Sequence, residues 1–293
     1  MLDEVPLSQD QLAAFAAIAR TGSFTRAARE LHLSQPALSR RIANLEAALE
    51  AVLVVRGRTG TSLTDAGRRV LGFVEAERAL EDELLGDLAP TPAAYRGVIR
   101  IAGVSSLLPP VVLPALAPFL RDHPAVQIEI RRTVETQLVE TLVAGLVDFT
   151  IAQGPAELPG IVDTPLGVEE FVMVESRMHA GRRDVFLDVA HSDTTTAWFL
   201  GAQPARLRPR GRWIRSFVYD EPGLLLAVEL GLGRAVKPRH TIPRRAAVRI
   251  DGSFRAMTRP VILQYRRQRF YSRLHTTVTS LVESAVRDYL ARS

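Results

Sequence analysis

The side chains with the clearest chemical potential lie close together in residues 34–40, near the N-terminus. Ser34 can accept a hydrogen bond from a first-turn N–H, and Pro36 loses no hydrogen bond in a first turn, so both favour the start of a helix. Gln35 and Arg40 then point outward. In the DNA major groove, glutamine pairs with adenine and arginine with guanine, while proline can touch a thymine methyl group. The stretch therefore predicts a DNA recognition helix.

Further polar groups flank this helix. Ser39 shares its outward side, and Ser23 and Thr25 begin the preceding helix, where hydroxyl and N–H groups can bind phosphate. Arg56 follows the recognition helix and is placed to reach the DNA backbone or the minor groove. Residues 20–41 carry five arginines against one glutamate, a local basic stretch. For any single arginine, an ordinary solvated or ion-paired surface position remains an alternative.

Short helices must hold these groups in place. Apolar residues recur at helical spacing in three consecutive segments, the second of which covers about residues 25–32. Leu38, Ile42 and Leu45 form the inner face of the third. Helices this short cannot bury their apolar faces alone, so they predict a compact helix-turn-helix unit. Residues 53–63 read as two short strands around a turn, which suits a wing.

A long helix is predicted from Asp65 to about Leu88, with an apolar stripe that includes Val70 and Phe73. A helix of this kind, leaving a small domain, most simply packs on a copy of itself. A core helix of the following domain is the alternative. The segment Ala89-Pro90-Thr91-Pro92 ends the helix.

After Tyr95 the pattern changes to apolar strands alternating with helices. This order predicts an α/β domain with a parallel, doubly wound sheet and right-handed crossovers. The predicted elements of its first half cover residues 98–102, 107–120, 126–130, 135–144 and 149–152. Those of its second half cover 171–174, 185–187, 213–218, 223–230 and 235–237, and a strand at 261–265 and a helix at 273–290 close the chain.

The N-terminal residues together resemble the LysR-type transcriptional regulators, in register through about 60 residues. The residues that carry the resemblance are Leu12, Phe15 and Ile18, Gly22-Ser23-Phe24-Thr25, Ala27-Ala28, Leu31, Ser34 to Ile42, Leu45-Glu46, Leu53, Arg56, and Leu63-Thr64-Asp65-Ala66-Gly67. Glu50 departs from the pattern, because the family usually has glycine there. A left-handed helix cap without glycine costs on the order of 1 kcal/mol, so we expect that the helix end, the wing and Arg56 can lie differently.

The resemblance implies three regions. They are a winged helix-turn-helix DNA-binding domain at 1–64, a linker and dimerisation helix at 65–90, and a two-lobed effector-binding domain, similar to periplasmic binding proteins, at 91–293. Lobe I would comprise about 96–165 and 262–293, and lobe II about 166–261. The implied function is sequence-specific DNA-binding regulation of transcription, controlled by a small-molecule effector between the lobes. The implied partners are double-stranded DNA, that effector, further copies in a homodimer or homotetramer, and bacterial RNA polymerase.

Polar residues follow the carboxyl ends of the first three predicted strands of the α/β domain, where ligands of open α/β sheets bind. They are the candidate effector-binding residues Ser105, Ser106, Thr133, Glu135 and Gln153. Glu135 aligns with a small polar position of the family, which argues against a simple carboxylate effector. The arginines within 206–215 either restore a preference for anions or lie on the surface.

Composition excludes several other classes. The 293 residues are 47% hydrophobic and 24% charged, as in a folded protein of about two domains, and contain no cysteine for disulfides or thiolate metal sites. No hydrolase, zinc-peptidase or P-loop motif is present, so we expect neither an enzyme nor a cofactor. Four prolines interrupt the uncharged residues 101–120, which argues against a membrane span. The acidic N-terminus shows no secretory signal, and we expect a cytoplasmic protein.

The net charge of +5 suggests a polyanionic partner, although the excess lies late in the chain. Residues 201–275 carry 17 basic against 4 acidic residues. Two alternatives to the regulator therefore stay open. One is an architectural DNA-binding protein with a degenerate sensor, which a cleft filled by side chains would favour. The other is a catalytic or solute-binding domain fused to a DNA-binding domain.

Overall fold

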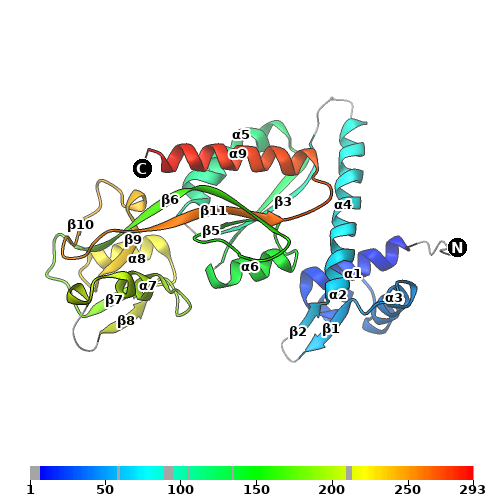
Figure 1. Ribbon diagram of the computed structural model, residues 1–293, viewed down its shortest axis with the longest axis horizontal. Coiled ribbons are helices and arrows are strands. Elements are labelled where there is room, and N and C mark those ends of the chain that lie inside the picture. The colour runs from blue at the N-terminus through cyan, green and yellow to red at the C-terminus, as the bar shows by residue number, and fades with distance from the viewer. Residues whose placement is uncertain are drawn as a thin grey trace.

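The structure is a computed structural model that describes residues 7–57, 60–88, 95–103, 106–133, 135–208 and 213–292. Figure 1 shows a small domain at one end, a long helix α4 that rises from it, and a two-lobed α/β domain beside that helix. We call residues 7–63 the head. Ser105 lies outside the described residues.

The head contains the three predicted helices and the predicted wing. Its elements are α1 (Gln9–Thr21), α2 (Phe24–Glu30), α3 (Gln35–Ala48), β1 (Val54–Gly57) and β2 (Gly60–Leu63), with β1 and β2 antiparallel. Gly22 ends α1 in a left-handed conformation, with a φ of 61°. The inner side chains of α1 and α3, among them Phe15, Leu38 and Leu45, are buried in one core. The predicted three-helix unit and wing are confirmed.

Glu50 adopts the left-handed conformation that the family usually gives to glycine, with a φ of 48°. The Ala51 N–H donates to the Glu46 carbonyl at 3.0 Å, which closes the end of α3. A carboxylate oxygen of Glu46 accepts hydrogen bonds from the N–H groups of Leu53 (2.7 Å) and Val54 (3.2 Å). The helix therefore ends at Glu50 in the conformation that glycine usually supplies, and β1 and β2 form the wing directly after it. Tertiary bonds to the wing offset the local strain at Glu50.

The linker helix α4 (Asp65–Asp87) is capped by Thr64, whose Oγ1 accepts from Gly67 N at 3.0 Å and donates to Val52 O at 2.7 Å. Leu71 is buried against the core of the head. Further along, α4 exposes large apolar side chains. Those of Phe73, Leu80, Leu84, Leu85 and Leu88 are each at least 40% exposed.

Lobe I is built on strands of the predicted parallel order. The elements of its first part are β3 (Gly97–Gly103), the π-helical turn η1 (Leu108–Val112), α5 (Leu113–Asp122), β4 (Val126–Arg132), α6 (Glu135–Val143) and β5 (Phe149–Ala152). Strand β3 pairs in parallel with both β4 and β5. In Figure 1, α5 and the C-terminal helix α9 (Arg273–Leu290) cover one face of the sheet and α6 the other.

Two long strands, β6 (Ile161–Ser176) and β11 (Met257–Arg266), connect the lobes and pair antiparallel to each other. Strand β6 runs from lobe I into lobe II, and β11 runs back. Because β11 also pairs antiparallel with β5, the sheet is mixed. Its order is β10-β6-β11-β5-β3-β4, where β10 covers Val248–Ile250, and β9 (Ala235–Pro238) also pairs with β6. The predicted strand at 171–174 is only the far part of β6. Its first half contains Pro165 and Gly167, which conceal a strand from sequence patterns.

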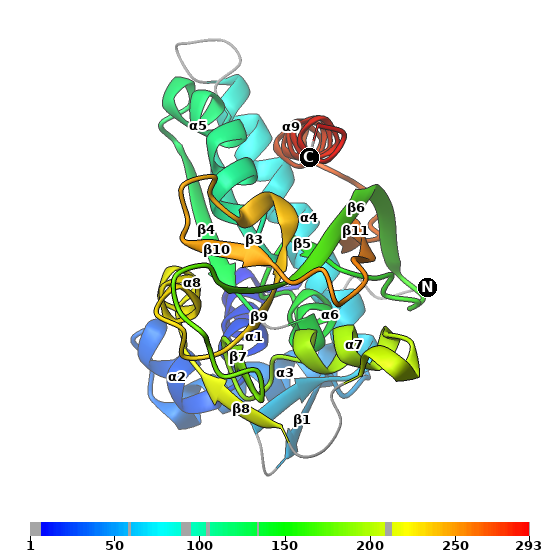
Figure 2. The ribbon, with the colours of Figure 1, turned by 90° about the vertical axis from the view of Figure 1, so that its left-hand side faces the viewer.

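Lobe II surrounds the far end of β6. Its elements are β7 (Val185–Asp188), α7 (Thr195–Ala202), η2 (Ala205–Leu207), β8 (Ile214–Phe217), α8 (Glu221–Glu229), β9 (Ala235–Pro238), η3 (Arg239–Thr241) and β10 (Val248–Ile250). Figure 2 shows α7 and α8 on opposite sides of these strands, where each covers its own apolar cluster. Helix α7 escaped sequence analysis because its residues, such as Trp198 to Leu200, show no amphipathic period.

Candidate DNA-binding surface and ligand cleft

The N-terminus of α3 presents a polar, exposed surface. The Ser34 Oγ accepts a hydrogen bond from Ala37 N at 3.3 Å and so caps the helix. Gln35, Pro36 and Arg40 are exposed beside it. The opposite side of α3 is buried in the head, so the orientation of the helix is fixed. Because the helix is capped and its other side is packed in the core, these side chains point away from the protein.

Strand β1 and helix α2 extend this surface. The Arg56 guanidinium donates to Ser39 Oγ at 3.2 Å and lies 3.8 Å from the centre of the Phe24 ring. Ser23 Oγ accepts from the first turn of α2 at 3.4 Å, and Thr25 is exposed beside it. The structure thus gathers all eight DNA-binding candidates at the junction of α2, α3 and the wing.

Fewer arginines of this region carry an unpaired charge than the sequence suggests. Arg20 pairs with Glu30, and Arg41 pairs with Asp10 at 3.0 Å. Arg40, in contrast, forms no ion pair with any described residue and is exposed. The arginine that the sequence predicts to contact bases is thus among those left available for a negative or hydrogen-bonding partner.

A cleft of about 690 Å³ lies between the lobes. Its lobe I wall includes Ser106, Thr133, Glu135 and Gln153, four of the five candidate effector residues. Its lobe II wall combines apolar residues with Asp188, Asp193 and Lys237. These candidates were chosen because they follow the carboxyl ends of strands, where ligands of open α/β sheets bind. In the structure they lie together on one wall of the cleft.

Gln153 organises the polar groups of the lobe I wall. Its backbone N–H donates to Glu135 Oε1 at 2.7 Å, and its side chain donates to Glu169 Oε2 at 2.8 Å and accepts from Arg259 at 3.0 Å. Glu169 is fully buried and also bonds His240 Nε2 at 2.8 Å. Burial raises the pKa of Glu135, although the bond from Gln153 acts in the opposite direction.

No sequence pattern predicted a role at the cleft for Glu169, Arg259 or His240. The first two lie on the crossing strands β6 and β11, and His240 lies in η3, so no strand-end rule marks them. Only a charged residue within an otherwise buried strand, as at Glu169, could have hinted at such a role.

Charged residues of lobe II are mostly neutralised by neighbours. Asp188 accepts from Arg215 at 2.6 Å and from Thr196 at 2.5 Å, and burial raises its pKa. Lys237 pairs with Glu221. Arg215 therefore supports the cleft wall through Asp188. Arg206 and Arg208 do not line the cleft, and Arg210 and Arg212 lie outside the described residues.

The two lobes also meet directly at the cleft. Arg132 of lobe I donates to the Tyr219 carbonyl of lobe II at 3.2 Å. Both residues line the cleft. This bond depends on the spacing of the lobes, so a change in that spacing would break it.

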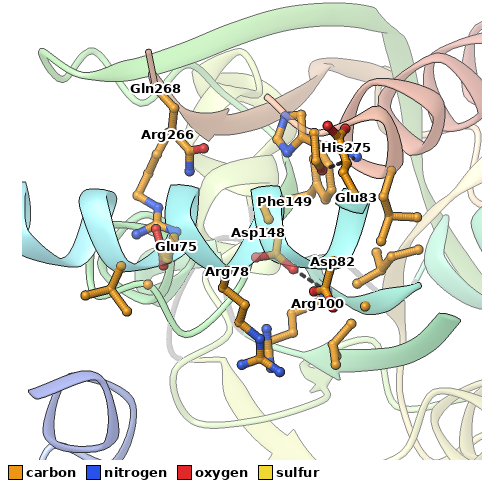
Figure 3. A pocket seen from close by; sticks show the side chains of 18 of the residues that line it. Glu75, Arg78, Asp82, Glu83, Arg100, Asp148, Phe149, Arg266, Gln268 and His275 are labelled. Carbon is orange, nitrogen blue, oxygen red and sulfur yellow. Dashed lines mark hydrogen bonds and ion pairs between the residues drawn. The ribbon is translucent and has the colours of Figure 1, made fainter. Parts of the chain in front are cut away.

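Helix α4 contacts lobe I around a second, smaller cavity of about 200 Å³ (Figure 3). Arg266 of β11 points at Glu75 of α4, and their side chains pair at 2.7 Å. Burial raises the pKa of Glu75, and burial together with the charge of Arg266 lowers the pKa of His275 to about 4. A Cβ at Gly145 would lie 2.6 Å from the Leu71 side chain. The linker thus packs on the head and on lobe I at once.

Other kinds of site find no support in the described ranges. No three His, Asp or Glu residues there are placed to hold a metal ion. No helix among those described has the length and apolar character needed to cross a membrane.

Family comparisons match both parts of the chain. The model described as "Bacterial regulatory helix-turn-helix protein, lysR family" matches residues 9–68, and the "LysR substrate binding domain" matches residues 92–287. A probable HTH-type transcriptional regulator, LrrA of Synechococcus elongatus, is 30% identical over 267 residues, which are 87% of each chain. The helix-turn-helix family model and LrrA are named as regulators and not as enzymes.

Other relatives match over less of their length. A probable hydrogen peroxide-inducible genes activator of Streptomyces viridosporus is 32% identical over 58% of this chain and 54% of its own. The chain spans about half the length of the first curated relatives it matches.

Solved structures share the whole fold. ArgP of Mycobacterium tuberculosis has a TM-score of 0.72 at 24% identity over 94% of this chain and 96% of its own. The full-length LTTR LysG of Corynebacterium glutamicum, with bound effector Arg, has a TM-score of 0.70 at 21% identity over 95% and 98%. Because family models cover the head and the α/β domain, and LrrA matches most of the chain, this protein belongs to the LysR family of helix-turn-helix transcriptional regulators.

Proposed function

We propose that the chain binds specific DNA sites through α3 and regulates transcription there. The observation that carries the proposal is the exposed N-terminus of α3, where Gln35 and Arg40 face outward while the other side of the helix is buried. A recognition helix presents its N-terminal residues to the major groove, where such side chains distinguish base pairs. Ser23, Thr25 and Arg56 are then positioned for the phosphate backbone.

A small molecule in the interlobe cleft controls this binding in our proposal. The volume of about 690 Å³ lies within the range of small-molecule sites. The structural relative LysG was solved with its effector Arg, which supports a ligand in a protein of this fold. A ligand that contacts both lobes changes their spacing, and the linker contacts at Glu75 and Gly145 pass that change to the head.

A second copy of the chain completes the DNA-binding unit. The exposed apolar side chains of α4, from Phe73 to Leu88, would be covered by the same helix of a partner. Two heads would then occupy half-sites about one DNA turn or more apart. We extend the proposal to a homodimer or homotetramer that works in the cytoplasm, at the chromosome, in contact with RNA polymerase.

The pairing through α4 can be tested by Leu84→Glu, which places a charge on the exposed apolar side. We expect sedimentation to show smaller assemblies and gel shifts to show weaker binding to a two-half-site fragment. Glu81→Gln, on an exposed position of the same helix, is the matched control. An unchanged assembly in Leu84→Glu would contradict pairing through this face.

The architectural alternative finds less support. It would be favoured by a cleft filled with side chains, and the cleft is open. Moreover, several arginines of the late basic region, including Arg215, Arg234 and Arg249, form ion pairs within the protein. Their charge is therefore less available to DNA than the sequence count suggests.

Selection of genomic fragments with the purified protein, followed by footprinting at stated salt concentrations, tests the proposed function. Salt matters because nonspecific binding to phosphates falls steeply as salt rises. We expect a discrete, partly palindromic site that survives competition by nonspecific DNA. Diffuse binding that salt abolishes would contradict the proposal.

A further inference from the structure

Two buried polar atoms of the interlobe cleft have no hydrogen-bond partner among the described residues. They are the Oε2 of Glu135 and the Oγ of Ser106, and both residues line the cleft. Leaving a buried polar group unpaired is costly, and native proteins rarely do so without a reason. Both atoms lie on the lobe I wall, so we regard them as groups that a ligand pairs.

A positive group lies beside this wall, on the crossing strand β11. Arg259 donates to Gln153 Oε1 at 3.0 Å, and its guanidinium lies 3.8 Å from the centre of the Trp198 ring. It lines the cleft and forms no ion pair with any described carboxylate. An arginine held by a neutral amide and an aromatic face keeps its charge and remains able to bind an anion.

Most other charged groups in and beside the cleft already have partners. Asp188 is paired with Arg215, and Glu169 is bonded to His240. The Asp193 carboxylate accepts backbone N–H groups, one of them that of Thr195 at 2.8 Å. Lys237 pairs with Glu221, and Arg132 donates to the Tyr219 carbonyl. Arg132 also keeps its charge, because a carbonyl is neutral. Glu135 and Arg259, however, are the two opposite charges that Gln153 holds close together and that a ligand can still neutralise.

The spacing of these two charges follows from Gln153. Its backbone N–H donates to Glu135 and its side-chain oxygen accepts from Arg259, so one residue separates the carboxylate from the guanidinium. They do not form an ion pair with each other. A small molecule with its charged groups a few bonds apart can reach both.

We infer that the effector is a small zwitterion, whose ammonium or guanidinium group pairs with Glu135 while its carboxylate or other anionic group pairs with Arg259. This inference rests on the proposed function of the cleft and names the class of its ligand. A simple carboxylate would leave the Oε2 of Glu135 buried without a hydrogen-bond partner, and a simple cation would leave the charge of Arg259 without an ion-pair partner. Sites with such groups discriminate strongly against ligands that lack the matching charge.

Calorimetry with the purified full-length protein tests the class directly. The probes are the standard L-amino acids, γ-aminobutyrate and glycine betaine. For each binder the panel includes the matched amine without the carboxylate and the matched carboxylate without the amine. We expect at least one zwitterion to bind, and both of its truncated analogues to bind roughly 30-fold more weakly or worse.

Two variants assign the charges to residues. Glu135→Gln keeps the acceptor for Gln153 N but removes the negative charge, so the zwitterion should bind roughly 30-fold more weakly while the carboxylate analogue binds at least as well as before. Arg259→Gln should weaken the zwitterion similarly and leave the amine analogue unaffected. Glu140→Gln on the same helix as Glu135, and Arg255→Gln before β11, change exposed charges and serve as matched controls.

Gel shifts on the same preparations separate this inference from the proposed function. If DNA binding is specific but no zwitterion binds, or a plain carboxylate or amine binds as tightly, the inference is overturned and the proposed function stands. An unchanged zwitterion affinity in Glu135→Gln overturns it equally. If specific DNA binding itself is absent, the proposed function fails whatever the cleft binds.

Discussion

The DNA-binding surface and the interlobe cleft are built in different ways. Every candidate DNA-binding residue lies between Ser23 and Arg56, and most of them are placed by caps and turns within the same short stretch. The cleft joins groups as far apart in sequence as Ser106 and Arg259, which meet only through the sheet. Local rules therefore suffice to build the first site, whereas the second depends on long-range packing.

The two sites also differ in burial. Gln35 and Arg40 are exposed and make few contacts within the protein, so their loss should change DNA binding more than folding. Glu135 and Glu169 of the cleft are largely buried in a hydrogen-bonded network, so changes beside them should alter stability as well as binding. The following variants, at other positions of the chain, test whether burial sets the cost of a substitution, from the largest expected effect to the smallest.

Arg234→Ala should destabilise lobe II by about 4 kcal/mol, because it leaves Asp251 buried without its partner at 3.0 Å. Arg249→Ala removes an exposed arginine from its pair with Glu175 in the same lobe. Because Arg183 stays 3.7 Å from Glu175, the loss should be about 1 kcal/mol or less. Denaturant unfolding measures both. Specific DNA binding by Arg234→Ala should persist, since the head folds on its own core. Equal losses of unfolding free energy in the two variants would contradict the claim that burial of the ion pair sets its cost.

Gly67→Ala should destabilise the joint of head and linker by about 3 kcal/mol, because the new Cβ would lie 2.2 Å from the Leu53 carbonyl oxygen. Gly72→Ala on the same helix meets no atom within 4 Å and should stabilise the protein by about 1 kcal/mol. Thermal and denaturant unfolding would show the opposite signs. Similar changes in stability in both variants would contradict the predicted clash between a Cβ at residue 67 and the Leu53 carbonyl.

His275→Phe should make the protein less sensitive to acid. The pKa of His275 is lowered to about 4 in the folded protein, below its usual value of 6.5, so the unfolded state binds the proton first as pH falls. Its contribution to stability is present above pH 6.5 and is lost between there and about pH 4.

Between pH 7 and 5 the wild type should therefore lose about 2 kcal/mol more than His275→Phe. Phenylalanine preserves the ring contacts with Phe149 and Tyr271. The carboxyls of Glu75 and Asp148, whose pKa values burial raises, act in the opposite direction but equally in both proteins. Denaturant midpoints at the two pH values measure the difference, and parallel losses would contradict the assignment.

Sequence patterns predicted the head well because its signals are local. Ser34 and Pro36 mark the start of α3, and Gly22 marks the end of α1, as the structure confirms. The departure at Glu50 left the wing placement open in the sequence. Hydrogen bonds from Leu53 and Val54 to Glu46 hold the wing regardless of that local preference.

The α/β domain was predicted less completely, for a physical reason. The strand-end rule placed Glu135 and Gln153 on the cleft wall, since it depends only on element order. Glu169, which is buried behind the cleft wall, and Arg259, which lines the cleft, escaped it because they lie on long strands whose pairing no local pattern specifies. The orientation of α4 against Glu75 and Arg266 depends equally on contacts between distant segments.

The central claim, that α3 recognises bases through its N-terminus, is tested most directly by Arg40→Ala in gel shifts at a stated salt concentration. Specific and nonspecific fragments are compared, with Arg29→Ala, an exposed arginine of α2, as the control. We expect Arg40→Ala to reduce the ratio of specific to nonspecific affinity roughly tenfold to a hundredfold, and Arg29→Ala to leave the ratio unchanged. An unchanged ratio in Arg40→Ala would contradict the claim.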